Sequence, residues 1–177
     1  ASVVGVDVGH GQLHPRLAQD ERVRALQGVN ARQLDASLLI ANNCAWTRAR
    51  GHSGPKNEAA TDAGDARFDL TRFDLIVADL SFISLALVLP ALAPLARPGG
   101  QLLLLAKPQF ELQPGQLGKG GIVRDAARYA EVQQRLCEAA TAAGLRVRHW
   151  LPSPITGGDG NREFFLHAER PAPAGGP

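Results

Sequence analysis

Two runs of apolar residues constrain the possible folds of this chain more than any other feature: FDLIVAD at 73–79 and QLLLLAK at 101–107. Each run is short, lacks the polar alternation of a half-exposed strand, and ends on a charged residue, which is typical of strands buried on both faces of a parallel sheet. Between them, residues 84–96 have a helical pattern that ends at the Pro-Gly-Gly sequence of 98–100. A strand, a helix and a second strand in this order predict a parallel βαβ unit.

The same alternation opens the chain. Residues 2–8 are expected to form a buried strand, 12–19 a short helix and 22–27 a second strand. Beyond the central unit, the pattern predicts a helix at 125–143 and then two strands joined by the loop PITGGDG, which is short enough to make them antiparallel neighbours. We therefore predict an α/β fold in which a mostly parallel, Rossmann-like sheet with helices on both faces is closed by a C-terminal antiparallel hairpin.

Residues 41–67 interrupt this pattern. They lack an apolar period and are rich in Ala, Gly, Asn and charged residues, so we expect a mobile surface loop inserted in the domain. Basic and aromatic side chains within it, such as Trp46 and Arg50, could touch RNA, but a plain solvated loop is the simpler expectation.

Composition and cysteine spacing exclude several classes of protein. Nineteen Lys and Arg against seventeen Asp and Glu give a formal net charge of +2, so any nucleic-acid contact must be a local patch. Cys44 and Cys137 lie outside any CxxC or Cys/His spacing, so neither a disulfide framework nor a metal site is expected. The apolar runs fall short of the roughly 20 residues that span a bilayer, and no signal peptide opens the chain, so we expect a soluble, cytoplasmic protein.

Four ionisable residues are expected at one edge of the sheet. Asp7, Asp79 and Lys107 each close an apolar strand, and Glu163 lies near the start of the last strand, which runs antiparallel and so begins at the same edge. Ligands of open α/β sheets bind outside the carboxyl ends of the strands, and clustered ionisable groups are over-represented at functional sites. A purely structural network of ion pairs is the alternative interpretation.

The segment GKGGIVRD at 118–125 is glycine-rich, but it lacks the GxxxxGK[ST] spacing of a phosphate-binding P-loop. We expect its glycines and Lys119 to form a flexible flap over the same edge, with Arg124 available for a phosphate.

Five segments, in this order, resemble the hemolysin A (TlyA-type) family: VDVGHGQL, DLIVADLSFISL, LLAKPQFE, GKGGIVRD and PSPITGGDGNREF. That family belongs with the FtsJ-like ribose 2′-O-methyltransferases, which act on ribosomal RNA with S-adenosylmethionine. The resemblance covers residues 3–170 except 41–67. It implies a class I methyltransferase domain over 1–170 with a disordered tail at 171–177, S-adenosylmethionine as cofactor, and ribosomal RNA or a ribosomal subunit as partner.

The resemblance also implies a Lys-Asp-Lys-Glu tetrad for methyl transfer. By motif, Asp79 takes the Asp position, Lys107 the second Lys and Glu163 the Glu. A ribose 2′-hydroxyl is a poor nucleophile, so a lysine beside it can accept its proton or, when charged, stabilise the developing alkoxide, and the sequence leaves both roles open. Asp79 and Glu163 would orient Lys107.

VDVGHGQL looks at first like the glycine loop that closes the first strand of a nucleotide-binding sheet. Such a loop is followed about 20 residues later by an acidic residue closing the next strand, but here that strand closes on Gln27. The resemblance instead makes it the second strand, with Asp7 on the ribose hydroxyls of the cofactor, Asn30 near the adenine, and Asp79 as a further cofactor contact. The first strand with its cofactor loop, the first tetrad Lys and a small RNA-binding domain are then expected before Ala1, and we expect weak or absent activity from this chain alone.

Candidate RNA contacts are Lys119, Arg124 and Arg162. Two other functions stay open. A non-catalytic, ribosome-associated RNA-binding protein would tolerate Asp79→Ala and Glu163→Ala without loss of function. A membrane-active hemolysin would need an amphipathic or spanning segment, which the sequence does not offer.

Overall fold

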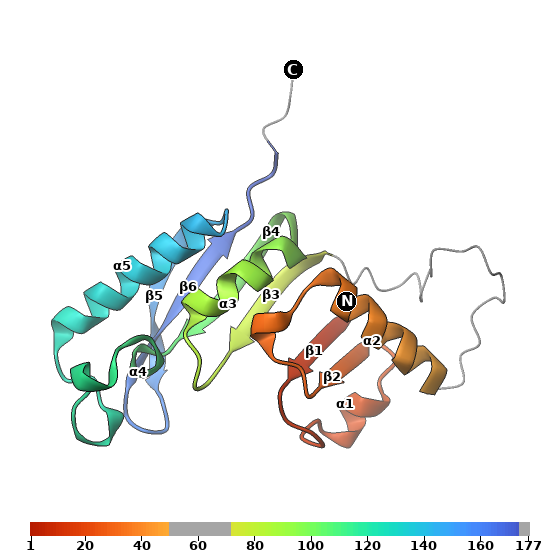
Figure 1. Ribbon diagram of the computed structural model, residues 1–177, viewed down its shortest axis with the longest axis horizontal. Coiled ribbons are helices and arrows are strands. Elements are labelled where there is room, and N and C mark those ends of the chain that lie inside the picture. Colours follow the sequence, from red (N-terminus) through yellow and green to blue (C-terminus); the bar gives the residue numbers. More distant parts are fainter. Residues whose placement is uncertain (50–71, 174–177) are drawn as a thin grey trace. The chain divides into compact units, whose positions relative to one another are not determined.

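The computed structural model describes residues 1–49 and 72–173, and these fall into two compact units, Ala1–Arg72 and Phe73–Pro177 (Figure 1). Each unit is described by itself below. Most of the segment expected to form an inserted loop and most of the expected tail lie outside the described residues.

Unit 1 is a parallel βαβ unit followed by a longer helix. Its elements are β1 (Val3–Asp7), α1 (Pro15–Gln19), β2 (Val23–Gln27), a 3-10 turn (Ala31–Gln33) and α2 (Ala36–Ala49). The two strands pair in parallel from Val3 opposite Val23 to Asp7 opposite Gln27. The strand, helix and strand predicted for the start of the chain are confirmed, but the prediction that the first strand is buried is wrong, because Val3 is 53% exposed and no residue of β1 is buried.

Helix α2 corrects the prediction of a loop beginning at residue 41, because the helix continues to Ala49. Its start is fixed by Asp35, whose Oδ1 accepts hydrogen bonds from the Leu38 amide at 2.7 Å and from the Ser37 hydroxyl at 2.5 Å. Alanine and leucine, both strong helix formers, are frequent in the first turns of the helix. Leu39, in the same turns, is buried. The helix that begins at this cap therefore includes residues 41–49, whose composition alone indicated a loop.

Unit 2 is a four-stranded sheet in the order β3-β4-β6-β5, with its helices on one face. Its elements are β3 (Phe73–Asp79), α3 (Leu85–Leu92), β4 (Ala96–Ala106), α4 (Pro108–Glu111), α5 (Ala126–Ala142), β5 (Arg146–Thr156), β6 (Arg162–Glu169) and 3-10 turns at Ala93–Leu95, Pro114–Gln116 and Lys119–Gly121. Strands β3 and β4 are parallel, and β6 runs antiparallel to both β4 and β5. The predicted α/β fold, with parallel pairing and a C-terminal antiparallel hairpin, is confirmed.

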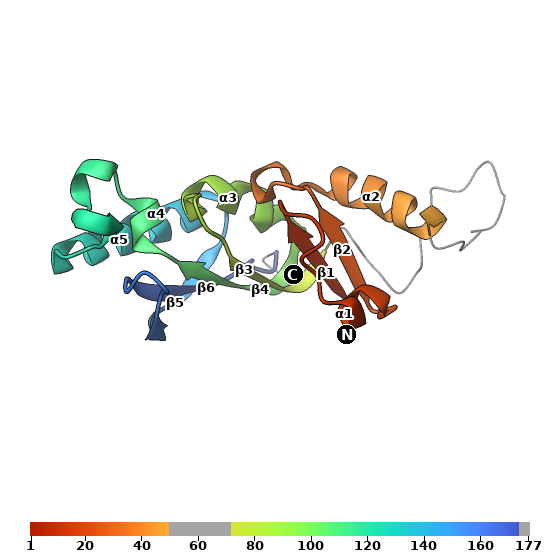
Figure 2. The same ribbon diagram turned by 90° about the horizontal axis from the view of Figure 1, so that it is seen from below.

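The core of unit 2 lies between the sheet and helices α3 and α5, which Figure 2 shows on the same face. Val132, Leu136 and Ala140 recur every fourth residue on α5 and are fully buried, the stripe expected of an amphipathic helix. From the sheet, Leu104 and Leu166 are fully buried with them. This packing sets the position of the strand ends at which the functional residues lie.

The opposite face of this sheet corrects the prediction that both central strands are buried on two sides. Leu102 and Leu104 of β4 are fully buried, whereas Leu75 and Val77 of β3 and Leu103 of β4 are exposed. Side chains alternate between the faces of a strand, and among the described residues of unit 2 the helices cover one face. The apolar runs thus predicted strands correctly but not which faces are covered.

The Pro-Gly-Gly sequence also has a different place from the one predicted. Helix α3 ends at Leu92, and residues 98–100 lie inside β4 instead of closing the helix. Gly99 has a positive φ of 78°, and a Cβ at Gly100 would lie 2.8 Å from the Phe73 carbonyl of the neighbouring strand. The register of β4 on β3 shifts at this point, so the glycines form an irregularity in the strand.

Candidate active site

Asp79 and Lys107 meet at the carboxyl ends of the parallel strands of unit 2. Asp79 is the last residue of β3, and Lys107 directly follows β4. The Lys107 Nζ lies 2.6 Å from Asp79 Oδ1 and donates a hydrogen bond to the Ser81 hydroxyl at 3.2 Å. The Lys107 side chain is 14% exposed and that of Asp79 is 68% exposed, so the lysine is held inward while the carboxylate faces solvent. Lys107 has an extended backbone, the conformation favoured for a residue that precedes proline.

Glu163 joins this pair from the antiparallel strand. It is the second residue of β6, and the next residue, Phe164, lies opposite the last residue of β4, so Glu163 comes level with Lys107. Glu163 is 8% exposed. Burial raises the pKa of its carboxyl above the ordinary value, and the nearby Lys107 cation opposes this in part. The negative charge of Asp79 raises this pKa further. The structure thus brings together Asp79, Lys107 and Glu163.

The turn before β6 supports the Glu163 carboxylate. A Cβ at Gly157 would lie 2.7 Å from Glu163 Oε1, so the absence of a side chain there lets the carboxylate approach the turn. Asp159, in the same turn, accepts hydrogen bonds from the side chain and the backbone of Asn161, which lower its pKa. Gly157 could not be told apart from its glycine neighbours by sequence, because its role depends on contact with a side chain of another element.

Asn161 connects this turn to the glycine-rich segment 118–125. Its buried side chain accepts a hydrogen bond from the Val123 amide at 2.9 Å and donates one to the Gly121 carbonyl at 3.0 Å. Val123 is itself buried. The segment predicted as a flexible flap is therefore anchored at two points. Sequence reasoning missed Asn161, although its place in the GNREF motif beside Glu163 was a usable signal.

An exposed aromatic residue lies just beyond Asp79. Phe82 is 91% exposed, and of the described residues it is the one non-glycine with a positive φ, at 64°. Its ring packs against Phe110, with ring centroids 5.0 Å apart. A non-glycine residue in this region of φ costs about 1–3 kcal/mol and is found preferentially at functional sites. Sequence reasoning missed Phe82, because neither its exposure nor its backbone conformation can be predicted from residue type.

The basic residues predicted to contact RNA are exposed in unit 2. Lys119 and Arg124 lie within the anchored segment, on either side of Gly121 and Val123. The Arg162 guanidinium lies 5.5 Å from the ring centroid of Tyr129 and 5.9 Å from that of Phe164, within cation–π range. This contact orients the guanidinium near the start of β6, one residue before Glu163.

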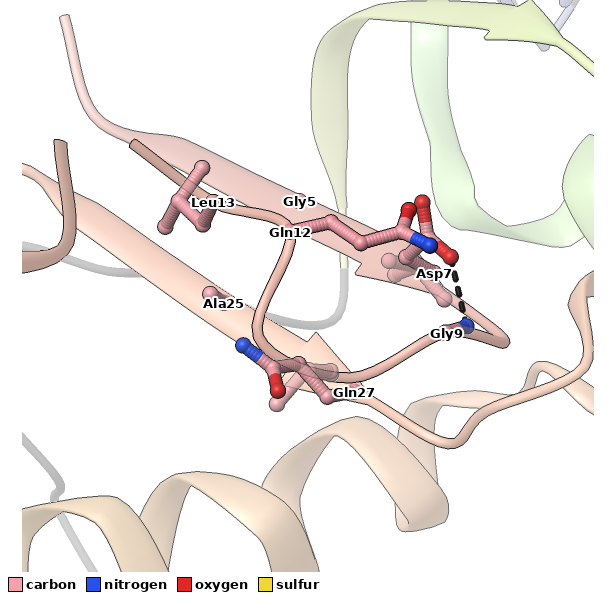
Figure 3. A pocket seen from close by; sticks show the side chains of 9 residues that line it. Gly5, Asp7, Gly9, Gln12, Leu13, Ala25 and Gln27 are labelled. Atoms are coloured by element: carbon pink, nitrogen blue, oxygen red, sulfur yellow. Dashed lines mark hydrogen bonds between the residues drawn. The ribbon is translucent and has the colours of Figure 1, made fainter. Parts of the chain in front are cut away.

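Asp7 and Asn30 belong to unit 1, at the carboxyl ends of its parallel strands. Asp7 closes β1, and its Oδ1 accepts a hydrogen bond from the Gly9 amide at 2.6 Å (Figure 3). Asp7 lines a cavity of about 290 Å³ together with small residues such as Gly5, Gly9 and Ala25. Asn30 is not among the residues lining this cavity, and its side-chain oxygen accepts a hydrogen bond from the Arg32 amide at 2.9 Å.

Among the described residues, no helix combines the length and hydropathy needed to cross a bilayer. In the same part of the chain, no group of three or more His, Cys, Asp or Glu residues is arranged to hold a metal ion.

Two curated relatives are each 37% identical to this chain over 166 residues, which is 94% of its length. One is YqxC of Bacillus subtilis, named as a candidate rRNA methyltransferase, and the match covers 49% of it. The other is TlyA of Mycobacterium tuberculosis, named as a 16S/23S rRNA (cytidine-2′-O)-methyltransferase, and the match covers 51% of it. The chain thus spans about half the length of the curated relatives it matches.

Solved structures show the same relationship. A structure described as a hemolysin from Streptococcus thermophilus is 34% identical, with a TM-score of 0.74, and the match covers 97% of this chain and 52% of that one. A structure described as an S-adenosylmethionine-dependent methyltransferase from Listeria monocytogenes is 8% identical, with a TM-score of 0.56, and shows the methyltransferase fold alone. The family described as FtsJ-like methyltransferase matches residues 1–170. With that match and the 37% identity over most of its length, the chain belongs to the FtsJ-like methyltransferase family.

Proposed function

We propose that this protein transfers a methyl group from S-adenosylmethionine to a ribose 2′-hydroxyl of ribosomal RNA. The observation that carries the proposal is the cluster of Asp79, Lys107 and Glu163 at one sheet edge, with Lys107 ion-paired to Asp79 at 2.6 Å. Transfer to a hydroxyl oxygen needs a group that removes a proton and a group that stabilises negative charge on oxygen. Lys107, which is largely shielded from solvent, and the carboxylate of Glu163 supply these two kinds of group.

We assign the stabilising role to Lys107. Its Nζ is fixed by Asp79 and the Ser81 hydroxyl, so it presents a positioned cation without reorganisation during the reaction. As the 2′ oxygen forms its bond to the methyl carbon, the carbon–sulfur bond breaks and the hydroxyl proton must leave. Glu163 is the acceptor we propose, because a carboxylate whose pKa burial has raised is a stronger base than an exposed one.

The residues of unit 1 fit the ribose portion of the cofactor. Asp7 presents an exposed carboxylate at the end of β1, and a carboxylate accepts hydrogen bonds from the two hydroxyls of a ribose. The cavity beside it is bordered by Gly5, Gly9 and Ala25, which leave room for a ligand close to the backbone. When bound, S-adenosylmethionine supplies a methyl group on a positively charged sulfur. We propose Asp7 as a ribose contact and retain Asn30 and Asp79 as candidate cofactor contacts.

Two features of unit 2 favour RNA as the methyl acceptor. Phe82 offers an exposed ring next to the Asp79–Lys107 pair, and unstacked RNA bases commonly stack on aromatic side chains. Lys119, Arg124 and Arg162 are exposed cations of the same unit. Because the net charge of the chain is only +2, phosphate groups would bind to such local cations and not to a general positive field. Ribosomal RNA in particular is proposed from the names of the relatives.

The test is direct methylation. The full-length natural protein is incubated with tritiated S-adenosylmethionine and ribosomal subunits that lack the modification, and the RNA is digested to nucleosides. We expect label in 2′-O-methylnucleosides, and none with Lys107→Ala. Label on a base instead of a ribose, or RNA binding without any transfer, would overturn the proposal, and the second result would favour a non-catalytic RNA-binding protein.

A further inference from the structure

Glu111 is a buried carboxylate of unit 2 that the proposed chemistry does not use. It is the last residue of α4, and its side chain is 1% exposed. Its Oε1 accepts a hydrogen bond from the Leu85 amide at 2.7 Å, and its Oε2 accepts one from the Ser84 hydroxyl at 2.6 Å. Arg135 of α5 lies 3.2 Å from Oε2 and also donates to the Glu111 backbone carbonyl. Both carboxylate oxygens are therefore satisfied from other elements.

These contacts join the two segments that follow the paired residues. Ser84 caps the N-terminus of α3 and lies five residues after Asp79, while Glu111 lies four residues after Lys107. The carboxylate thus ties the end of the loop after β3 to the short helix after β4. Two short connections that are fixed to each other leave the ends of β3 and β4 little freedom to separate.

The surroundings explain why a charge is tolerated at this buried position. The first amides of α3 carry partial positive charge, which stabilises an anion at the helix N-terminus. Arg135 neutralises the carboxylate from a third element. A buried carboxylate with these partners is stable, but removal of its charge leaves donors at the start of α3 and on α5 without an adequate acceptor.

We infer that Glu111 is a positioning residue for methyl transfer, which holds Asp79 and Lys107 at the separation that keeps the Lys107 cation in place. The inference rests on the proposed function. It predicts that Glu111 acts on the rate of transfer and not on the binding of cofactor or RNA, because it lies beneath the site and its polar atoms are occupied by protein groups.

The first test does not depend on activity. In Glu111→Gln, the amide group keeps the size of the side chain but cannot accept hydrogen bonds on both sides. We expect amide hydrogen exchange of residues 80–86 and 107–111 to rise at least tenfold. Glu131→Gln, which removes an exposed carboxylate from the Arg128 pair on α5, is the matched control and should leave both segments unchanged. Unchanged exchange in Glu111→Gln would overturn the inference.

The second test measures transfer by the full-length protein on ribosomal subunits. Glu111→Gln should lower kcat at least tenfold while the KM values for cofactor and RNA stay within about twofold. When Asp79→Asn is already present, Glu111→Gln should lower kcat by a smaller factor, because the Asp79–Lys107 pair that Glu111 positions is already broken. A rise in either KM with unchanged kcat would contradict a positioning role. Absence of transfer by the unsubstituted protein would instead count against the proposed function, and the exchange experiment would still decide the inference.

Milder variants cover the case in which Glu111→Gln does not fold. Ser84→Ala removes one of the two side chains that contact the Glu111 carboxylate, the other being Arg135. It should also lower kcat, but by a smaller factor than Glu111→Gln. Ser84→Thr keeps the hydroxyl and should restore the rate. Equal rates for the two Ser84 variants would overturn the inference.

Discussion

Asp7 in unit 1 and Asp79 in unit 2 both close a parallel strand, but their carboxylates have different partners. Asp7 Oδ1 accepts a hydrogen bond from the Gly9 amide, two residues further along its own chain. Asp79 forms an ion pair with Lys107, which comes from the neighbouring strand 28 residues later in the sequence. The first carboxylate shapes a local turn beside a cavity, and the second fixes a cation.

The different partners suit the two carboxylates to different roles, one in binding and one in the reaction. A carboxylate held by its own turn keeps lone pairs for neutral donors such as ribose hydroxyls, so it is suited to binding. A carboxylate that holds a buried lysine sets the electrostatics of a reaction. The same residue type at the same topological position therefore takes two roles, and the following variants test that division in order of decreasing effect.

Lys107→Ala is expected to have the largest effect. It removes the cation on which both Asp79 and the proposed chemistry depend, so kcat should fall about a thousandfold, a loss typical of a central electrostatic group. Single-turnover methylation of ribosomal subunits measures it. Lys107→Arg is the control, because it keeps the charge but not the compact ammonium, and it should recover part of the rate. Full activity of Lys107→Ala would remove Lys107 from the mechanism.

Glu163→Gln should lower kcat about a hundredfold, within the range for a general base. Burial raises the pKa of Glu163, so the carboxylate form, which accepts the proton, becomes populated only as the pH rises through that raised value. The single-turnover rate of the unsubstituted protein should therefore climb as the pH rises through that raised value and then level off, and Glu163→Gln should lose that dependence. A pH dependence that Glu163→Gln leaves unchanged would rule out Glu163 as the base.

The paired variants Asp7→Asn and Asp79→Asn test the comparison itself. Asparagine at position 7 keeps an oxygen for the Gly9 amide but loses the charge, so the Kd for S-adenosylmethionine should rise about tenfold, or about 1.4 kcal/mol. The rate at saturating cofactor should hardly change. Asparagine at position 79 should lower that rate by at least a comparable factor. Calorimetric titration and single-turnover assays separate the two, and a shared pattern of effects would abolish the distinction between the carboxylates.

Phe82→Ala should have the smallest effect, and it should fall on RNA. Loss of one stacking contact is worth about 1–3 kcal/mol, so the KM for the RNA substrate should rise about fivefold or more. The Kd for the cofactor should stay constant. Leu87→Ala, which removes an exposed apolar side chain from α3, is the matched control and should leave the KM for RNA unchanged. Equal effects of the two substitutions would show that Phe82 has no particular role.

The strands and most of the helices could be predicted because their signals are local. Apolar runs, helical periods and breakers gave β1, β2, β3 and α5 close to their observed bounds, whereas β4 begins at Ala96, ahead of the predicted run at 101–107. Two predicted boundaries, the start of the loop at residue 41 and the end of α3, were wrong because other contacts outweighed the local sequence pattern. The cap at Asp35 and the burial of Leu39 extended α2 into an expected loop, and the Gly99–Gly100 pair became a strand irregularity instead of a helix end.

Within the candidate site, the sequence identified the residues that project from strand ends but not those that support them. Asp79, Lys107 and Glu163 could be named because parallel topology delivers strand ends to one edge. The contacts of Asn161 and Glu111 could not be predicted, even though Asn161 stands in the GNREF motif, since they are hydrogen bonds to segments 24–40 residues away in the sequence. The packing of the fold decides which of these distant segments come into contact.

The sequence by itself determined the α/β class, the order of the strands along the chain and the residues that close them. Those features follow from hydropathy and from turn chemistry over a few residues. The tertiary structure alone decided that Lys107 is buried against Asp79, that Glu163 is desolvated beside them, and that Phe82 is exposed in a strained conformation. Burial and electrostatic environment depend on which elements pack together, so they arise only when distant segments of the chain meet.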